Sequence, residues 1–274
     1  MRGVTQRLLA PIALAALLVV PRTLRAQDST SGKIGDVQHS ADAAKHKGGG
    51  GGGGDGSDSD DDSGFGWEVT RFFLFGVYPR DTGQGYQSYP YAASGPYLRR
   101  QVTDGRTFGV VTTSYFADDQ STLRALHVSI EWAGGVLRRE FEFSSYWEPL
   151  ADHTDHLQMF RLSFTAMPPL GDVGYLKIGA GVQAVTVGSD AATGPEVEAG
   201  VQLFPRRPFG LSATARVAPL TWNGGEVFGV GFVDLSASGS VFFGPVEVQA
   251  GYRWTRIGVG APFRGPTLGL RVWF

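Results

Sequence analysis

The chain has 274 residues, with 24 basic and 26 acidic residues, a formal net charge of −2 and no cysteine. This balance gives no basic excess for nucleic-acid binding. The lack of cysteine excludes a disulfide framework, thiolate metal ligands, a cysteine nucleophile and a cysteine-linked lipid anchor. Glycine is abundant, at 40 residues, while aromatic residues still make up 12%. The length suits one sizeable domain or two small ones.

Residues 1–26 have the pattern of a secretory signal peptide. Arg2 and Arg7 precede an apolar run over 8–20, which is about as long as a signal-peptide core and shorter than the roughly 20 residues of a spanning helix. Ala26 supplies a small residue for cleavage. An N-terminal membrane anchor is the alternative, and the proline and arginines directly after the apolar run count against it. Cleavage would remove four arginines and no acid, which leaves 20 basic and 26 acidic residues and a net charge of −6.

Residues 27–66 form a segment with almost no large apolar side chain. Seven consecutive glycines at 48–54 are followed by five aspartates among serines and glycines at 55–62. Such a composition buries too little surface to offset the entropy of ordering, so we expect a disordered, self-repelling linker. The alternating aspartates suggest a calcium loop as an alternative, but the glutamate and flanking helices of an EF-hand are missing.

Residues 67–103 are rich in aromatic residues and proline. The stretch 67–78 is aromatic and partly alternating, whereas 86–97 combines Tyr, Pro, Gly and Ser. Pro90 and Pro96 disfavour a regular strand there. We interpret this pre-barrel segment as an extra strand, a helix at the membrane surface or a plug.

From residue 104 to residue 274 the sequence repeatedly alternates between apolar and polar residues, which is the period of β-strands. In the stretch 246–255, for example, Val248 and Trp254 share one face and Glu247 and Arg253 the other. We expect about ten such strands, within a range of 8–12, and the first covers 107–116. They are longer than the usual five or six residues of soluble strands and long enough to cross a bilayer. The predicted fold class is all-β, an antiparallel up-and-down transmembrane β-barrel.

The polar faces of these strands carry six acids and six bases that we expect to line the lumen. They are Glu131, Arg138, Glu140, Glu142, Arg161, Lys177, Glu196, Glu198, Arg216, Glu247, Arg253 and Arg271. The opposite faces are small and apolar, as contact with lipid requires, and a closed barrel pairs every backbone polar group. Mutual pairing of the twelve charges is expected to close the lumen.

The connections between strands are predicted to alternate in length. The longer ones, at one end of the barrel, are 117–121, 148–155, 188–195, 220–226 and 257–265. The tighter ones, at the other end, are 134–135, 168–172, 205–208 and 244–245. Longer extracellular loops facing short periplasmic turns are typical of outer-membrane barrels.

The stretch 268–274 places Leu268, Leu270, Val272 and Phe274 on one face. This pattern resembles the terminal strand signal of bacterial outer-membrane β-barrel proteins, which end in Phe preceded by alternating apolar residues. The resemblance implies export to the outer membrane of a Gram-negative cell. It implies two partners, the outer-membrane lipid and the barrel-assembly machinery that reads this strand. It identifies no subfamily, and we predict no cofactor, no metal and no nucleic-acid partner.

A barrel of eight strands is just wide enough for side chains to fill, and ten strands are only slightly wider. We therefore expect a structural or interaction protein or a narrow, porin-like passive channel, and not an enzyme. The transported solute, the binding partner and the oligomeric state are not predicted.

An outer-membrane protease is the alternative function. Its weak candidate residues, all near predicted loops, are Asp118, Asp119, Asp152, His153, Asp155 and His156. They resemble the residues of the omptin proteases, which set an Asp pair against an Asp–His pair across a ten-stranded barrel, where the His activates water. The predicted loops are too short to build much of a cleft. The two histidines also have the spacing of a metal site on one helical turn, but no helix is predicted there.

Overall fold

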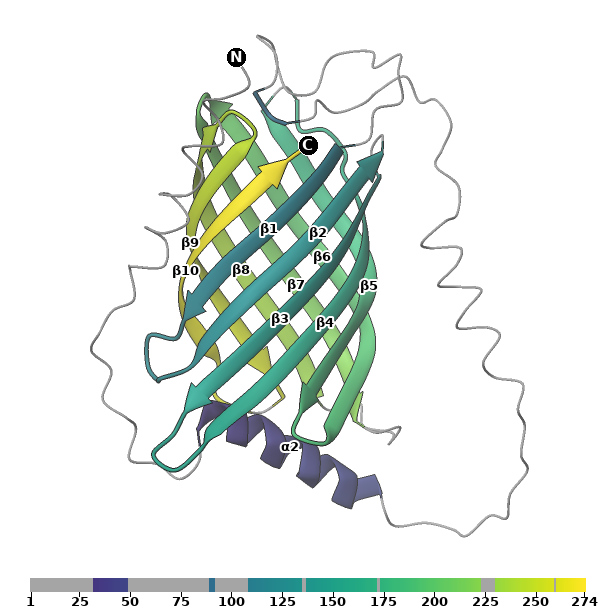
Figure 1. Cartoon of the computed structure of the whole chain (residues 1–274). Coiled ribbons are helices and arrows are strands. Elements are labelled where there is room, and N and C mark those ends of the chain that lie inside the picture. Colours follow the sequence, from purple (N-terminus) through teal and green to yellow (C-terminus); the bar gives the residue numbers. More distant parts are fainter. Residues whose placement is uncertain are drawn as a thin grey trace, which may run out of the picture.

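The computed structural model describes residues 32–48, 89–91, 108–134, 137–171, 173–222, 230–258 and 260–274. Within these ranges, ten antiparallel strands close into one barrel and a helix, α2 (Lys33–Gly48), lies across one mouth (Figure 1). The strands are β1 (Phe108–Ala117), β2 (Arg124–Gly134), β3 (Leu137–Pro149), β4 (Thr154–Ala166), β5 (Gly174–Val187), β6 (Asp190–Arg206), β7 (Phe209–Trp222), β8 (Val230–Phe243), β9 (Val246–Ile257) and β10 (Phe263–Trp273). The predicted ten-stranded antiparallel barrel is confirmed.

Each strand pairs with its neighbours in sequence, and β1 pairs with β10 to complete the ring. The β1–β10 register runs from Val110 opposite Trp273 to Phe116 opposite Thr267. Beyond the ladder, the Gly109 amide donates to the Phe274 carbonyl at 2.8 Å, and the Phe274 amide donates to the Gly109 carbonyl at 3.0 Å. The closed sheet therefore has no free edge.

The two ends of the barrel differ in their connections. We call the mouth formed by 118–123, 150–153, 188–189, 258 and 260–262 the loop end, and the mouth where β1 begins and β10 ends the turn end. The predicted loop at 188–195 is corrected, because β6 already begins at Asp190. Gly188, with a φ of 57°, allows a two-residue turn there, since glycine adopts positive φ at little cost.

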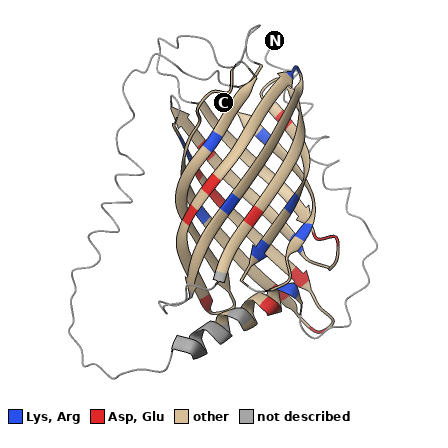
Figure 2. Ribbon diagram, turned by 180° about the vertical axis from the view of Figure 1, so that it is seen from behind, with Lys and Arg blue, Asp and Glu red and all other residues tan. Residues whose placement is uncertain are grey.

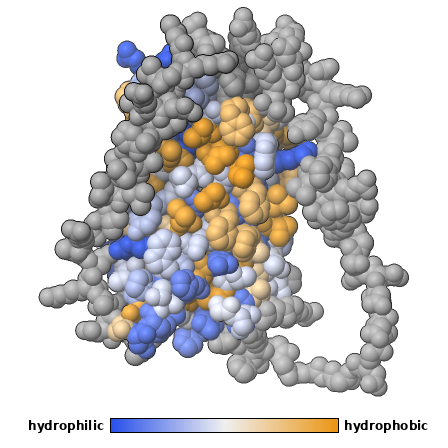
Figure 3. Space-filling view, in the orientation of Figure 1, coloured by the Kyte–Doolittle hydropathy of each residue, from blue (hydrophilic) through white to orange (hydrophobic). Residues whose placement is uncertain are grey.

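The alternation of side chains makes the barrel apolar outside and charged inside. Ile178, Val182 and Val197 point outward and are each more than half exposed. Figure 3 shows apolar side chains gathered over the wall of the barrel and hydrophilic ones toward the loop end. Figure 2 shows acidic and basic residues on the strands, and the ones described below are buried within the barrel.

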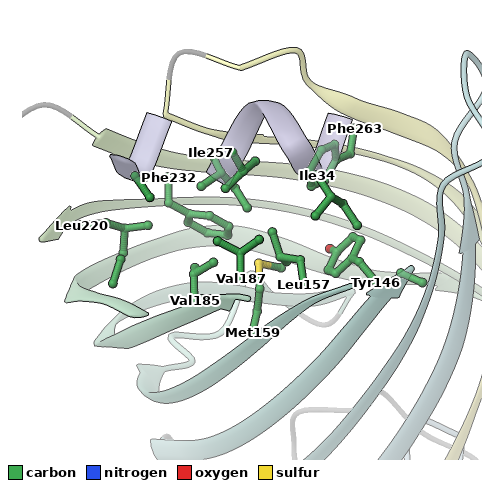
Figure 4. Packing of buried hydrophobic residues seen from close by; sticks show 14 of the residues in the cluster. Ile34, Tyr146, Leu157, Met159, Val185, Val187, Leu220, Phe232, Ile257 and Phe263 are labelled. Carbon is green, nitrogen blue, oxygen red and sulfur yellow. The ribbon is translucent and has the colours of Figure 1, made fainter. Parts of the chain in front are cut away.

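The interior contains three layers along the barrel axis. The loop-end apolar layer includes Tyr146, Leu157, Val187 and Phe232, together with α2 (Figure 4). The turn-end apolar layer consists of Phe108, Val110, Ala133, Met167, Tyr175, Phe204, Phe242 and Trp273. The predicted charged residues lie between these layers.

Helix α2 corrects part of the linker prediction. It falls within 27–66, where the composition predicts disorder, yet Ile34, Val37 and Ala41 share one helical face and are buried in the loop-end apolar layer. A helix of this length is marginal alone and is stabilised by packing, which composition does not report. None of the helical residues that the structure describes forms a segment long and apolar enough to cross a membrane.

The other N-terminal predictions fall mostly outside the described residues. These are the signal peptide at 1–26, the remainder of the 27–66 linker and most of the 67–103 segment. Within the last, Tyr89 and Tyr91 pack against the turn-end apolar layer. The Tyr91 hydroxyl donates to the Phe209 carbonyl at 2.5 Å, and its ring meets Phe242 edge-on at a centroid distance of 5.3 Å.

Candidate functional site

The structure places all twelve predicted lumen residues inside the barrel. Eleven are buried, and the side chain of Arg216 is 12% exposed. They come from β2, β3, β4, β5, β6, β7, β9 and β10, at the inward positions that a two-residue period dictates. The charged layer therefore draws on most of the strands of the barrel.

Arg161 of β4 lies among four glutamates. One of its terminal nitrogens is 2.8 Å from Glu198 and 3.3 Å from Glu196. The other is 2.6 Å from Glu140 and 3.2 Å from Glu142. The planar guanidinium suits such multiple pairing, because its donors point in fixed directions toward several carboxylates.

A second chain of ion pairs lies nearer the turn end. Arg138 contacts Glu140 and lies 2.9 Å from Glu131. Arg271 lies 2.8 Å from the same Glu131 and 3.6 Å from Glu247. Glu131 therefore joins two arginines from different strands, and the two chains of pairs meet at Glu140.

Asp234 of β8 is a lumen residue that the sequence analysis missed. Arg253 donates to it at 2.6 Å, and so does the Thr255 hydroxyl at 2.6 Å. Arg253 also lies 2.9 Å from the Nδ1 atom of His127. The glycine-rich sequence around β8 made it hard to predict that Asp234 points inward. The serines at 236, 238 and 240 lie on the same inward face, and this polar alternation could have indicated it.

The charged layer leaves a cavity of about 130 Å³ in the lumen. Charged side chains of β2, β3 and β5 line one part of it, and small hydroxyl side chains of β1, β7 and β8 line another. A polar space of this size has room for ordered water or a small solute.

Helix α2 is fixed over the loop end by two carboxylates from the barrel. The Lys33 ammonium lies 2.9 and 3.0 Å from the carboxylate oxygens of Asp118 and donates to the Pro262 carbonyl at 3.0 Å. The Ile34 amide, in the first turn of the helix, donates to Glu148 at 3.0 Å. A carboxylate at this position satisfies a free amide and complements the helix dipole.

Two of the candidate catalytic residues are engaged near α2. Asp118 is buried, holds Lys33 and accepts the Arg264 amide at 2.8 Å. Asp119 is more exposed, accepts the Tyr252 hydroxyl at 2.6 Å and lies 3.4 Å from the Arg264 guanidinium. Both aspartates therefore take part in structural contacts.

The loop between β3 and β4 brings three other candidates together. His153 Nδ1 lies 2.6 Å from Asp152, and its Nε2 lies 3.2 Å from Asp155. The hydrogen bond to Asp152 raises the pKa of His153 above its ordinary value of 6.5 and lowers the pKa of Asp152. An imidazole with both nitrogens held by carboxylates favours the protonated form over a free base.

The structure does not assemble the six candidates into one site. Among the described residues, no hydrogen bond or ion pair joins Asp118 or Asp119 to His153 or His156. His156 is exposed on β4, opposite Trp147 of β3. Within the same part of the chain, no group of three or more His, Asp or Glu side chains is arranged to hold a metal ion.

The four residues of the predicted assembly signal belong to β10 and the residue after it. Leu268, Leu270, Val272 and Phe274 alternate with the inward Arg271 and Trp273, and Val272 and Phe274 are exposed on the outer wall. They lie at the junction of β10 with β1.

No family model and no curated protein matches the chain. Among solved structures it is similar to the β domain of the Bordetella autotransporter BrkA, at 11% identity over 61% of this chain and 98% of that one, with a TM-score of 0.37. It is also similar to the translocator domain of the autotransporter NalP from Neisseria meningitidis, at 12% identity over 63% of this chain and 90% of that one, with a TM-score of 0.34. LpxR from Salmonella typhimurium is similar at 7% identity over 62% of this chain and 100% of that one, with a TM-score of 0.35.

The outer wall and the lumen of this barrel differ from those of a soluble barrel. A soluble barrel buries apolar side chains and exposes polar ones, whereas this barrel exposes Ile178 and Val197 and buries Arg161 and its glutamates. Lipid satisfies an apolar wall, and a closed sheet satisfies the demand for paired backbone groups in hydrocarbon. The chain is a transmembrane β-barrel of the outer-membrane type.

Proposed function

We propose that this chain is a closed outer-membrane barrel that acts as a structural or interaction protein, and neither as an open channel nor as an enzyme. The charged layer carries this proposal, because its side chains pair across the lumen between strands far apart in the ring. Arg216 of β7, for example, lies 3.0 Å from Glu142 of β3.

The energetics of the charged layer favour a closed state. Removing one member of a buried ion pair typically costs about 3–5 kcal/mol, because the partner charge is left without compensation. A continuous pore through the lumen would separate several such pairs at once. The apolar layers at both mouths add a second barrier, since water does not readily enter a packed apolar layer.

The loop end is the part of the barrel best suited to an interaction. In outer-membrane barrels the longer connections face outward and the short turns face the periplasm. This orientation exposes α2 and the loop carrying His153 to the cell exterior. The exposed residues Asp36, Gln38 and His39 of α2 belong to that surface.

A non-enzymatic role fits the state of the candidate catalytic residues. Both nitrogens of His153 contact carboxylates, and Asp118 is bound to Lys33. A general base needs a free nitrogen or carboxylate oxygen within reach of a bound substrate. Neither group offers that in this arrangement.

Conductance measurements on the full chain test the proposal. The refolded protein, with heat-modifiable migration on gels as proof of folding, is added to planar lipid bilayers. We expect no steady ion conductance from the parent, and compare it with variants lacking 32–48 or 67–104. If conductance appears when either segment is removed, that segment blocks ion flow in the parent. Steady conductance from the folded parent would overturn the proposal.

A further inference from the structure

Lys177 is the exceptional cation of the lumen. It lies on β5, is only 5% exposed and lines the cavity of about 130 Å³. It forms no hydrogen bond or ion pair with any residue that the structure describes. Each of the five lumen arginines, by contrast, has a carboxylate partner. Burying an ammonium that forms no ion pair is costly, so a bound ligand that accepts its hydrogen bonds would stabilise it.

The lining of the cavity is cationic overall. Five cations and three carboxylates face it, namely Arg138, Lys177, Arg216, Arg253 and Arg271, and Glu131, Glu140 and Glu142. The other lumen acids do not line the cavity, but each contacts an arginine of the charged layer. They are Glu196, Glu198, Asp234 and Glu247. With these four, the described part of the lumen holds seven acids against six bases, so an anion would be attracted by the ammonium of Lys177, which forms no ion pair, and not by a surplus of positive charge.

Hydroxyl groups complete the lining. Ser129, Thr214 and Ser236 face the cavity, and their hydroxyls form no hydrogen bond with another described residue. A hydroxyl can turn its hydrogen toward an acceptor, and an ammonium offers three donors. These groups together present donors from several strands to one small space.

We propose that the cavity binds a small inorganic anion, with Lys177 as its principal charge partner and the hydroxyl groups as additional donors. Hydrogen bonds to an anion in a low-dielectric interior are stronger than in water. The volume admits an ion the size of sulfate and its water. A cation beside Lys177 is disfavoured, because it would face an ammonium of the same charge. This site goes beyond the proposed structural role and does not depend on whether the barrel conducts.

The test compares the thermal unfolding of the full chain, refolded in detergent, in sodium sulfate and in sodium gluconate of equal ionic strength. Gluconate is the reference because it is a much bulkier anion than sulfate. Sulfate far above its dissociation constant should raise the unfolding midpoint of the parent by about 4 °C or more. Sulfate also stabilises proteins in general, so the variants decide the result.

Two lysine variants separate the site from the general effect. In Lys177→Met the extra shift in sulfate should disappear. In Lys33→Met, which removes a buried lysine paired with Asp118 at the loop end, the shift should persist. An equal shift in the parent and in Lys177→Met would overturn the proposal, as would the absence of any shift in the parent.

A crystallographic measurement keeps the proposal testable even if Lys177→Met does not fold. The parent is refolded and crystallised in selenate, whose selenium gives an anomalous signal. The signal is expected inside the cavity beside the Lys177 ammonium. A cavity that holds only water in such crystals would overturn the proposal.

Discussion

The Lys33 ammonium lies within 3.0 Å of both carboxylate oxygens of Asp118, although the two residues are 85 positions apart in the chain. The pair is buried and fixes the start of α2 to the connection between β1 and β2. We predict that Asp118→Asn releases α2, because a buried ammonium without its partner costs about 3–5 kcal/mol. A fluorophore at position 41, buried in the parent, should become accessible to an aqueous quencher.

The neighbouring aspartate provides the control for this experiment. Asp119 is exposed and contacts Tyr252 and Arg264 on the outer surface. Asp119→Asn should leave the fluorophore protected, since exposed ion pairs contribute about 0–1 kcal/mol. Equal quenching in the two variants would refute the role of the buried pair.

Arg161 provides a test of the charged layer. Arg161→Met leaves Glu140, Glu142, Glu196 and Glu198 close together without their shared cation. We expect the free energy of unfolding in detergent, measured by urea titration, to fall by about 3–5 kcal/mol. Replacing the exposed Arg264 in the same way should change it by less than about 1 kcal/mol. A small effect in both would mean that the layer contributes little to stability.

Val248 and Gln249 are adjacent on β9 and test the facing of the wall. Val248 lies on the outward face and Gln249 lines the lumen cavity. Val248→Arg places a cation in lipid and should cost about 2–4 kcal/mol near the bilayer midplane. Val248→Ala is the control, because it shortens the side chain without adding charge. A label at 248, and not at 249, should be quenched by lipid-soluble reagents, so equal quenching would argue against a membrane wall.

His153 gives a prediction for pH. Its pKa is raised in the folded protein, first by the hydrogen bond to Asp152. The contribution of this contact to stability is therefore fully present below about pH 6.5, the unfolded value, and is lost as the pH rises through the folded pKa. Titration of the ring by NMR should show the elevated pKa, and Asp152→Asn should lower it. An identical midpoint in parent and variant would contradict the contact.

The barrel was predictable from the sequence because each strand repeats one simple rule over many residues. Inward charges such as Glu131 and Arg271 alternate with outward apolar residues, and a register error of one position would invert the whole strand. The partners of these charges were not predictable. Nothing near Arg161 in the sequence indicates that it meets Glu196 and Glu198 of β6, since that contact depends on the curvature and register of the closed sheet.

Helix α2, unlike the strands, could not be predicted from the sequence. Its apolar face consists of only Ile34, Val37 and Ala41 in a polar segment, so local composition argues against order. The partners that stabilise it, such as Asp118 and Glu148, lie far along the chain. Asp234 was missed for a different reason: glycine and serine on β8 weaken the contrast between its two faces.

The pairing of β1 with β10 fixes the order in which the barrel can be completed. β1 is the earliest strand of the barrel to be synthesised, and the strand that covers its outer edge is the latest. Until β10 arrives, both edges of the growing sheet present unpaired backbone groups that can capture other chains. Folding therefore has no intermediate stage at which the sheet protects both of its edges. The closing step, with its large sequence separation, should also be the slow one.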